Sequence, residues 1–253
     1  MRTLVALWRL ACVGRLLLAG VLRCAFIFPF VSPAQRLWQT GRWCGQVARA
    51  LGMQIESSGR SHDGPALIVA NHISWLDILA INAVHPARFV SKADVKRWPV
   101  LGWLIGCGGT LFIERERKRD ALRVVHQIAA SLKQGDTIAM FPEGTTGDGS
   151  TLLPFHANLL QAAISTDAMI QPIALRYVDA DSVPSQAVVW VGDATLAQSL
   201  RKVVYARGLK VLVTQLATLP SAGQDRRELA TRVRREIGLA LGVDASTLDE
   251  PAH

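Results

Sequence analysis

Residues 66–84, Ala-Leu-Ile-Val-Ala-Asn-His-Ile-Ser-Trp-Leu-Asp-Ile-Leu-Ala-Ile-Asn-Ala-Val, decide the fold class of this 253-residue chain. Ala66–Ala70 is a short apolar run bounded by polar residues, which is typical of a buried strand. Trp75–Val84 has its apolar residues at helical spacing, and Asn71 and Ser74 suit the turn between the two elements. The segment therefore predicts a strand, a turn and a helix, which is the repeating unit of α/β proteins.

The same alternation of strands and helices continues toward the C-terminus. Further strands are expected at Thr110–Glu114, Thr137–Phe141, Ile170–Val178, Val188–Val191 and Lys210–Leu216. Further helices are expected at Asp120–Gln134, Ala157–Ser165, Leu196–Ala206 and Arg226–Leu241. A polar, glycine-containing linker, Ser57–Gly64, precedes the first strand. This order predicts an α/β fold over residues 57–253, a mixed, largely parallel sheet flanked by helices.

The first 56 residues are a separate N-terminal segment that is both apolar and basic. Residues 1–60 hold eight Arg and one acid, Glu56, so that this quarter of the chain carries +7 of the total net charge of +8. Apolar and basic residues in one segment indicate contact with an anionic membrane surface. A nucleic-acid-binding protein more often carries its charge on a polar, Lys-rich face. We expect membrane-associated helices over residues 1–56, the second near Ala34–Leu51, and no nucleic-acid partner.

The sequence leaves open how the first helix meets the membrane. Its clean apolar runs, Leu16–Leu22 and Cys24–Val31, are shorter than the ~20 residues that a spanning helix needs. Arg9, Arg15 and Arg23 interrupt the apolar region, which disfavours a cleaved signal peptide, and the scarcity of Ser disfavours a transit peptide. A helix lying in the interface and a tilted or spanning helix both fit this pattern.

The four cysteines, at positions 12, 24, 44 and 107, are scattered along the chain. They form no CxxC pair and have no His nearby at metal-ligand spacing, which argues against a zinc site and against a disulfide framework. This usage favours a reducing compartment. We expect no metal and no redox cofactor.

The pair His72 and Asp77 is the first candidate for chemistry. Because it follows a predicted strand, it lies where the ends of strands present functional groups in α/β sheets. The two side chains meet only if His72 lies on the turn and Asp77 projects back from the first turns of the helix. A carboxylate on one imidazole nitrogen fixes the tautomer and leaves the other nitrogen as a general base. This spacing therefore predicts a His–Asp acid–base pair.

Three further segments carry residues suited to binding. Gly109–Arg115 is a strand that ends in an Arg, the side chain that binds phosphate or carboxylate with a planar fork. Phe141–Thr146 places a tight Gly turn and two Thr at the end of another strand, where hydroxyls and amides suit an anion. Ile170–Ala174 is a strand that contains a Pro.

Taken together, the four segments resemble the glycerolipid acyltransferase superfamily, which makes phosphatidic acid from lysophosphatidic acid. The matches are NHxxxxD as NHISWLD, GxxFIxR as GTLFIER, FPEGT as FPEGTT, and the Pro-containing strand as IQPIA. The resemblance implies that His72 is the catalytic base and Asp77 its orienting partner. It also implies that the polar head of the acceptor is bound by four residues, Arg115, Glu143, Gly144 and Thr145.

The activity implied by the resemblance is lysolipid O-acylation. A fatty acyl group would pass from acyl-carrier protein or acyl-CoA, as co-substrate, to the hydroxyl of 1-acyl-sn-glycerol-3-phosphate, giving phosphatidic acid in phospholipid biosynthesis. The expected location is the inner (cytoplasmic) membrane, with the catalytic domain on the cytoplasmic side. The alternative acceptor is a lyso-ornithine lipid, because Thr146 stands where many relatives that acylate lysophosphatidic acid have Arg or Lys. Gly147–His156 is also similar to the lyso-ornithine lipid subgroup.

Two rival classes are disfavoured. A serine hydrolase would need a nucleophile turn, and no GxSxG occurs in the chain. A non-catalytic membrane-binding protein would explain the N-terminal segment, but it would not require His72 together with Asp77.

Overall fold

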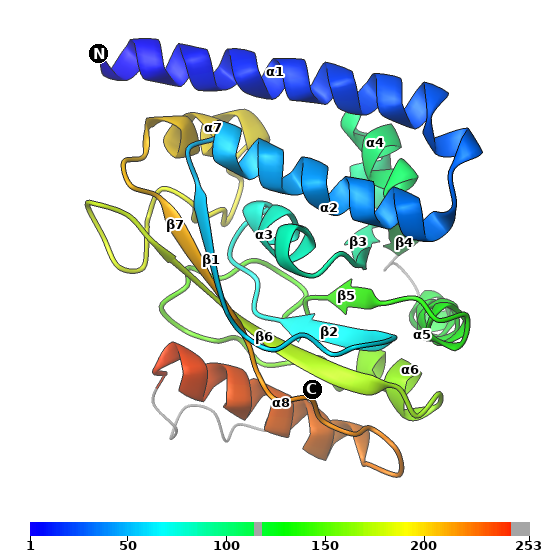
Figure 1. Cartoon of the computed structure of the whole chain (residues 1–253). Helices are drawn as coiled ribbons and strands as arrows, with labels where there is room; N and C mark the ends of the chain where they lie inside the picture. The colour runs from blue at the N-terminus through cyan, green and yellow to red at the C-terminus, as the bar shows by residue number, and fades with distance from the viewer. Residues whose placement is uncertain (114–117, 244–253) are drawn as a thin grey trace.

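The computed structural model describes residues 1–113 and 118–243, and in this part of the chain seven strands form one sheet (Figure 1). Its order is β1-β7-β6-β2-β5-β3-β4. The strands are β1 (Gln54–Gly59), β2 (Ala66–Ala70), β3 (Arg88–Lys92), β4 (Leu111–Ile113), β5 (Ile138–Met140), β6 (Met169–Val178) and β7 (Lys210–Gln215). All neighbours are parallel except β6 and β7. The predicted mixed, largely parallel sheet is confirmed.

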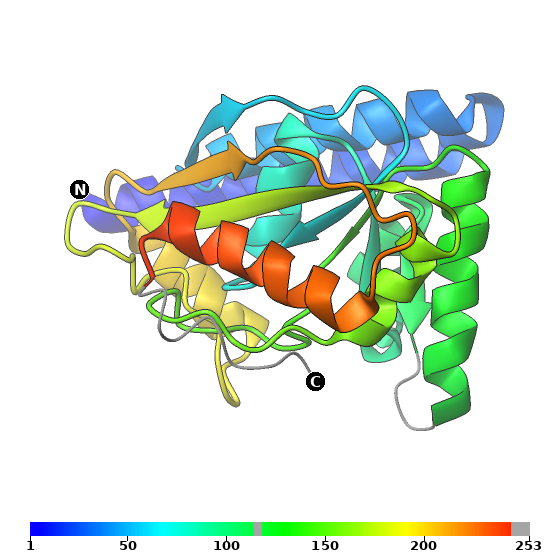
Figure 2. The same cartoon turned by 90° about the horizontal axis from the view of Figure 1, so that it is seen from below.

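Helices cover both faces of the sheet (Figures 1 and 2). One face carries α1 (Arg2–Phe26), α2 (Pro33–Ala50), α3 (Leu76–Val84) and α7 (Leu196–Tyr205), and the other α5 (Lys118–Lys133), α6 (Gln161–Ile164) and α8 (Arg226–Leu241). A short helix, α4 (Leu101–Cys107), and three 3-10 turns, η1 (Phe28–Phe30), η2 (Ala93–Arg97) and η3 (Ala157–Leu160), complete the described elements.

β2 shows why the sheet forms the centre of the molecule. All five of its residues are buried. Because side chains alternate along a strand, Ile68 and Ala70 pack in the core below α2 and α3, while Leu67 and Val69 pack in the core shared with α5 and α8. A strand buried on both faces reads as a continuous apolar run, which is what residues 66–70 show.

The N-terminal helix α1 lies along the domain across α2 and α7 (Figure 1). The Arg9 guanidinium donates hydrogen bonds to the carbonyls of Val204 (2.8 Å) and Ala206 (3.0 Å), where the C-terminal end of α7 leaves carbonyls unpaired. The Trp43 indole of α2 donates to the carbonyl of Leu16 at 2.9 Å. One side of α1 is therefore attached to α7 and α2, and its other side is exposed.

Several sequence expectations differ from the structure. The predicted linker begins with Ser57, Ser58 and Gly59, which belong to β1, a polar edge strand paired with β7. The division after residue 56 consequently falls inside β1. The strand predicted at Val188–Val191 is wrong: this apolar run is a loop. A short apolar run alone does not distinguish a strand from a buried loop.

The sequence analysis missed β3 and α4 altogether. β3 is short and carries a charged residue at each end, Arg88 and Lys92, so it lacks the apolar run of the other strands. The predicted helix Ala157–Ser165 is divided between η3 and α6, and the strand predicted at Thr110–Glu114 is β4. The second N-terminal helix is confirmed as α2, which begins with a capping box between Ser32 and Gln35.

Candidate active site

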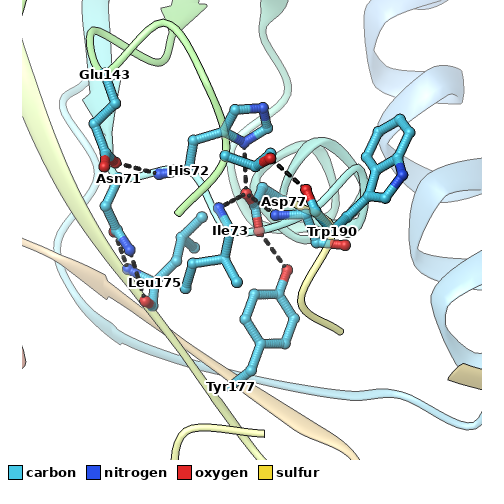
Figure 3. A network of polar contacts seen from close by, with 10 residues as sticks. Asn71, His72, Ile73, Asp77, Glu143, Leu175, Tyr177 and Trp190 are labelled. Carbon is cyan, nitrogen blue, oxygen red and sulfur yellow. Dashed lines mark hydrogen bonds and ion pairs between the residues drawn. The ribbon is translucent and has the colours of Figure 1, made fainter. Parts of the chain in front are cut away.

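The carboxyl ends of β2 and β5 lie side by side because the two strands are parallel neighbours. His72 follows β2, and Glu143 follows β5. Beyond Ala70 the Asn71 amide continues the ladder toward β6: its Nδ2 donates to the Leu175 carbonyl at 3.0 Å, and its Oδ1 accepts from the Leu175 N–H at 2.8 Å (Figure 3). Asn71 therefore fixes the point at which the chain leaves the sheet and turns toward α3.

Asp77, in the first turn of α3, is completely buried and accepts four hydrogen bonds (Figure 3). Its Oδ2 lies 2.7 Å from His72 Nδ1 and accepts from the N–H groups of Ile73 (2.7 Å) and Ser74 (2.9 Å). Its Oδ1 accepts from the Tyr177 hydroxyl at 2.8 Å. A buried carboxylate is stable only with such partners, and the N-terminus of α3 favours its negative charge. The predicted contact between His72 and Asp77 is confirmed.

The His72 imidazole is held in one orientation. It stacks on the Phe141 ring with a centroid separation of 4.0 Å and an interplanar angle of 6°. With Nδ1 at Asp77, the other ring nitrogen, Nε2, bonds none of the residues that the structure describes. The side chain is 19% exposed. This arrangement leaves Nε2 open to a bound hydroxyl, which is the geometry of a general base.

Glu143 is turned inward, away from solvent. Its Oε1 accepts from the His72 N–H at 2.6 Å (Figure 3). Its Oε2 accepts from the Leu153 N–H at 3.1 Å. Burial raises the pKa of Glu143 to about 8, against the opposing effect of the two backbone hydrogen bonds. In this structure the carboxyl group supports the backbone of His72.

The remaining predicted site residues lie around the same loop. Gly144 has a φ of 72°, a conformation that favours glycine, and it turns the chain sharply after β5. The Thr145 side chain is exposed beside this turn. Arg115 follows β4 in the sequence, but it lies outside the described residues.

The loop after Gly144 is hydrogen-bonded to the turn after β2 that carries His72 and Ile73. The Gly147 N–H donates to the His72 carbonyl at 2.7 Å, and the Trp190 N–H donates to the Ile73 carbonyl at 3.4 Å. The Thr146 hydroxyl donates to the Trp190 carbonyl. Thr146 therefore joins the loop after β5 to the loop that contains Trp190.

Sequence reasoning missed Tyr177, which supports Asp77 from β6. It lies 100 positions beyond its partner, and a Tyr within an apolar strand reads as a core residue. The ring is fully buried, and burial next to Asp77 raises its pKa well above the usual value, so the hydroxyl keeps its proton and acts as a donor. The sequence does hold one signal, a Tyr hydroxyl at an interior position of an apolar strand, because a buried Tyr hydroxyl usually has a hydrogen-bond partner.

A buried carboxylate that holds an imidazole at the carboxyl edge of the sheet is the arrangement of a general acid–base pair. The family model described as Acyltransferase matches residues 30–176. The chain belongs to this acyltransferase family.

Similar proteins come from several bacteria. The chain is 37% identical to the lyso-ornithine lipid O-acyltransferase of Pseudomonas aeruginosa, over 82% of this chain and 79% of that protein. It is 34% identical to the 1-acyl-sn-glycerol-3-phosphate acyltransferase of Neisseria gonorrhoeae, over 79% and 78%. The crystal structure of the 1-acyl-sn-glycerophosphate acyltransferase PlsC from Thermotoga maritima has the same fold, with a TM-score of 0.71 at 18% identity over 96% of this chain and 97% of that one.

Replacing Asp77 by Asn should preserve the fold and lower kcat by about 10³–10⁴-fold, because an amide no longer fixes the tautomer of His72. Tyr177→Phe removes one of the four donors, so it should lower kcat by roughly tenfold and the free energy of unfolding by about 1–3 kcal/mol. Steady-state kinetics and urea unfolding measure both effects. A folded Asp77→Asn enzyme with an unchanged kcat would refute the orienting role.

The buried carboxyl of Glu143 should make the stability of the protein fall with rising pH. Its pKa is about 8 in the folded chain and near the ordinary value of 4.5 in the unfolded chain. Between these values the unfolded state binds fewer protons, so the free energy of unfolding should fall by up to about 1.4 kcal/mol per pH unit. Glu143→Gln should flatten this slope between pH 5 and pH 8, while Glu236→Gln, on the exposed side of α8, should not. Urea unfolding at a series of pH values measures the slope. Parallel plots of the free energy of unfolding against pH for wild type and Glu143→Gln would contradict the raised pKa of Glu143.

Proposed function

We propose that the protein is a lysolipid O-acyltransferase that transfers a fatty acyl group from an acyl thioester to 1-acyl-sn-glycerol-3-phosphate, giving phosphatidic acid. The observation that carries this proposal is the 2.7 Å contact between His72 Nδ1 and Asp77, which leaves Nε2 open in a chain of the acyltransferase family. The donor is a thioester of acyl-carrier protein or of coenzyme A.

The proposed reaction is direct transfer. His72 Nε2 takes the proton of the acceptor hydroxyl while that oxygen attacks the thioester carbonyl carbon. The tetrahedral intermediate then collapses: the carbon–sulfur bond breaks, the new ester remains, and the imidazolium returns the proton to the departing thiolate. Asp77 stabilises the imidazolium between the two steps, so the reaction needs no metal and no redox cofactor.

The acceptor would lie with its polar head at the carboxyl ends of β4 and β5. Arg115 and Thr145, with the backbone of Gly144, are proposed to contact this head, since they follow those strands in the sequence. Glu143 takes a different part in the proposal. Both of its oxygens are bonded to backbone N–H groups, so it positions the His72 turn and the acceptor loop together.

Membrane attachment is proposed through α1. Within Arg2–Phe30, an 18-residue window has a mean hydropathy of 2.0, and 11% of that window is buried inside the protein. Because Arg9 and Trp43 attach one side of α1 to the domain, the helix is suited to lie in the interface with its exposed side in lipid. The proposed location is the inner membrane, with the domain facing the cytoplasm.

A lyso-ornithine lipid is the second candidate acceptor. One observation favours it: position 146 holds Thr, whose hydroxyl is bonded to the Trp190 carbonyl, so this position adds no cation to the head-group site. The similarity to the Pseudomonas aeruginosa protein points the same way.

The function is tested with purified protein, a panel of lysolipids, and palmitoyl thioesters of acyl-carrier protein and of coenzyme A. Wild type should acylate 1-acyl-sn-glycerol-3-phosphate, and His72→Ala should lose the activity by at least about 10³-fold because the general base is missing. Wild type and His72→Ala should bind vesicles equally. Full activity of His72→Ala would overturn the proposed mechanism, and vesicle binding without any transfer would favour a non-catalytic membrane-binding protein.

The acceptor preference is tested at position 146. Thr146→Arg should raise kcat/KM for 1-acyl-sn-glycerol-3-phosphate relative to a lyso-ornithine lipid by about tenfold, since a charge-assisted hydrogen bond to phosphate contributes about 1.5–3 kcal/mol. Thr146→Met, which removes the hydroxyl without adding charge, is the control. An unchanged ratio in Thr146→Arg would show that position 146 does not select the acceptor.

A further inference from the structure

The short helix α4 carries an exposed apolar surface that the catalytic mechanism does not use. Its sequence, Leu-Gly-Trp-Leu-Ile-Gly-Cys, contains no charged residue. Trp103 is 47% exposed, and Val100, immediately before the helix, is 58% exposed. Val100 has a φ of 61°, which is unusual for a β-branched residue. Two large apolar side chains are thus presented to the outside at this element, although its Leu104 is buried.

This surface lies next to the C-terminal end of α1. The thiols of Cys24 in α1 and Cys107 in α4 lie close enough to influence each other's ionisation, and the two helices pack together (Figure 1). The end of α1 and the turn that follows it also expose large apolar residues. We call the combined set the α4 patch: Phe26, Ile27, Phe30, Val100 and Trp103. Exposed apolar side chains therefore lie on two helices that are in contact with each other.

The charges around the α4 patch suit an anionic lipid surface. Lys96 and Arg97 are exposed in η2, directly before the patch, together with one acid, Asp94. Elsewhere on the N-terminal helices, the Arg42 guanidinium of α2 stacks over the exposed Trp38 ring at 4.8 Å from its centroid. Exposed Trp side chains and cations are typical of residues at the level of lipid head groups.

The α4 patch is also connected, through Trp98 and Trp190, to the turn that carries His72. Trp98, between η2 and α4, contacts Trp190 edge to face, with ring centroids 6.3 Å apart. The Trp190 backbone bonds the Ile73 carbonyl, next to His72. A membrane contact at α4 would consequently lie one aromatic contact away from the loop that carries the base.

We propose that α4 is a second membrane-contacting element, in which Val100 and Trp103 enter the head-group and acyl-chain boundary of the same anionic bilayer as α1. This contact fixes the side of the domain near Trp98 and Trp190 against the lipid surface. A lysolipid acceptor then reaches His72 from the bilayer without crossing water. The last step rests on the proposed function, whereas the membrane contact itself does not.

The contact is tested by collisional quenching with vesicles that contain phosphatidylglycerol and a brominated phosphatidylcholine. Of the seven Trp residues, Trp103 should contribute a strongly quenched component that is lost in Trp103→Phe. Trp103→Asp should raise the lipid concentration for half-maximal binding by roughly tenfold, because a carboxylate replaces an apolar ring at the boundary. Leu239→Asp, at a 52% exposed position of α8, is the matched control and should bind like wild type.

Acyl-transfer activity of the same variants is measured with two acceptors. One is embedded in vesicles, and the other is a short-chain acceptor below its critical micelle concentration. Trp103→Asp should lower kcat/KM about tenfold for the embedded acceptor only. Equal quenching in wild type and Trp103→Phe, or unchanged vesicle binding of Trp103→Asp, would overturn the proposal. A raised KM for acyl-carrier protein with unchanged quenching would overturn it in favour of a protein-docking site. Because quenching and binding need no acceptor, these results are independent of whether the proposed function holds.

Discussion

The structure depends on one buried carboxylate. Asp77 has no contact with solvent, and an unpaired charge in such a place would cost several kcal/mol. Four donors prevent this, and each comes from a part of the chain that must be in place: the imidazole of His72, the N–H groups of Ile73 and Ser74, and the hydroxyl of Tyr177 on β6. The turn that carries His72, the start of α3 and β6 are thereby held in one arrangement.

A second buried carboxyl group joins the loops from two strands. Glu143 follows β5 and supports the backbone of His72, which follows β2, while its other oxygen supports Leu153. Phe141, two positions before Glu143, stacks on the imidazole. The segment Phe141–Glu143 after β5 therefore fixes both the backbone position of His72 and the orientation of its ring. This explains why a motif assigned to acceptor binding has its acidic residue, Glu143, turned inward.

The sequence was sufficient for the features that depend on local patterns. The apolar run of β2, the turn residues around His72 and the basic, apolar N-terminus predicted the sheet, the His–Asp contact and the helices α1 and α2. It was not sufficient where long-range contacts decide. Tyr177 meets Asp77 only because β6 pairs with β2, β3 has no apolar pattern, and the inward orientation of Glu143 follows from backbone donors that any residue could supply.

The 2.7 Å contact with Asp77 should hold His72 in the tautomer that leaves Nε2 unprotonated. Nitrogen-15 NMR of the imidazole, assigned by comparison with His72→Gln, measures the tautomer in the resting protein. We expect the neutral ring to carry its proton on Nδ1, with a bare Nε2, and Asp77→Asn to lose this preference. A neutral ring protonated on Nε2 in the wild type would refute the orienting role of Asp77.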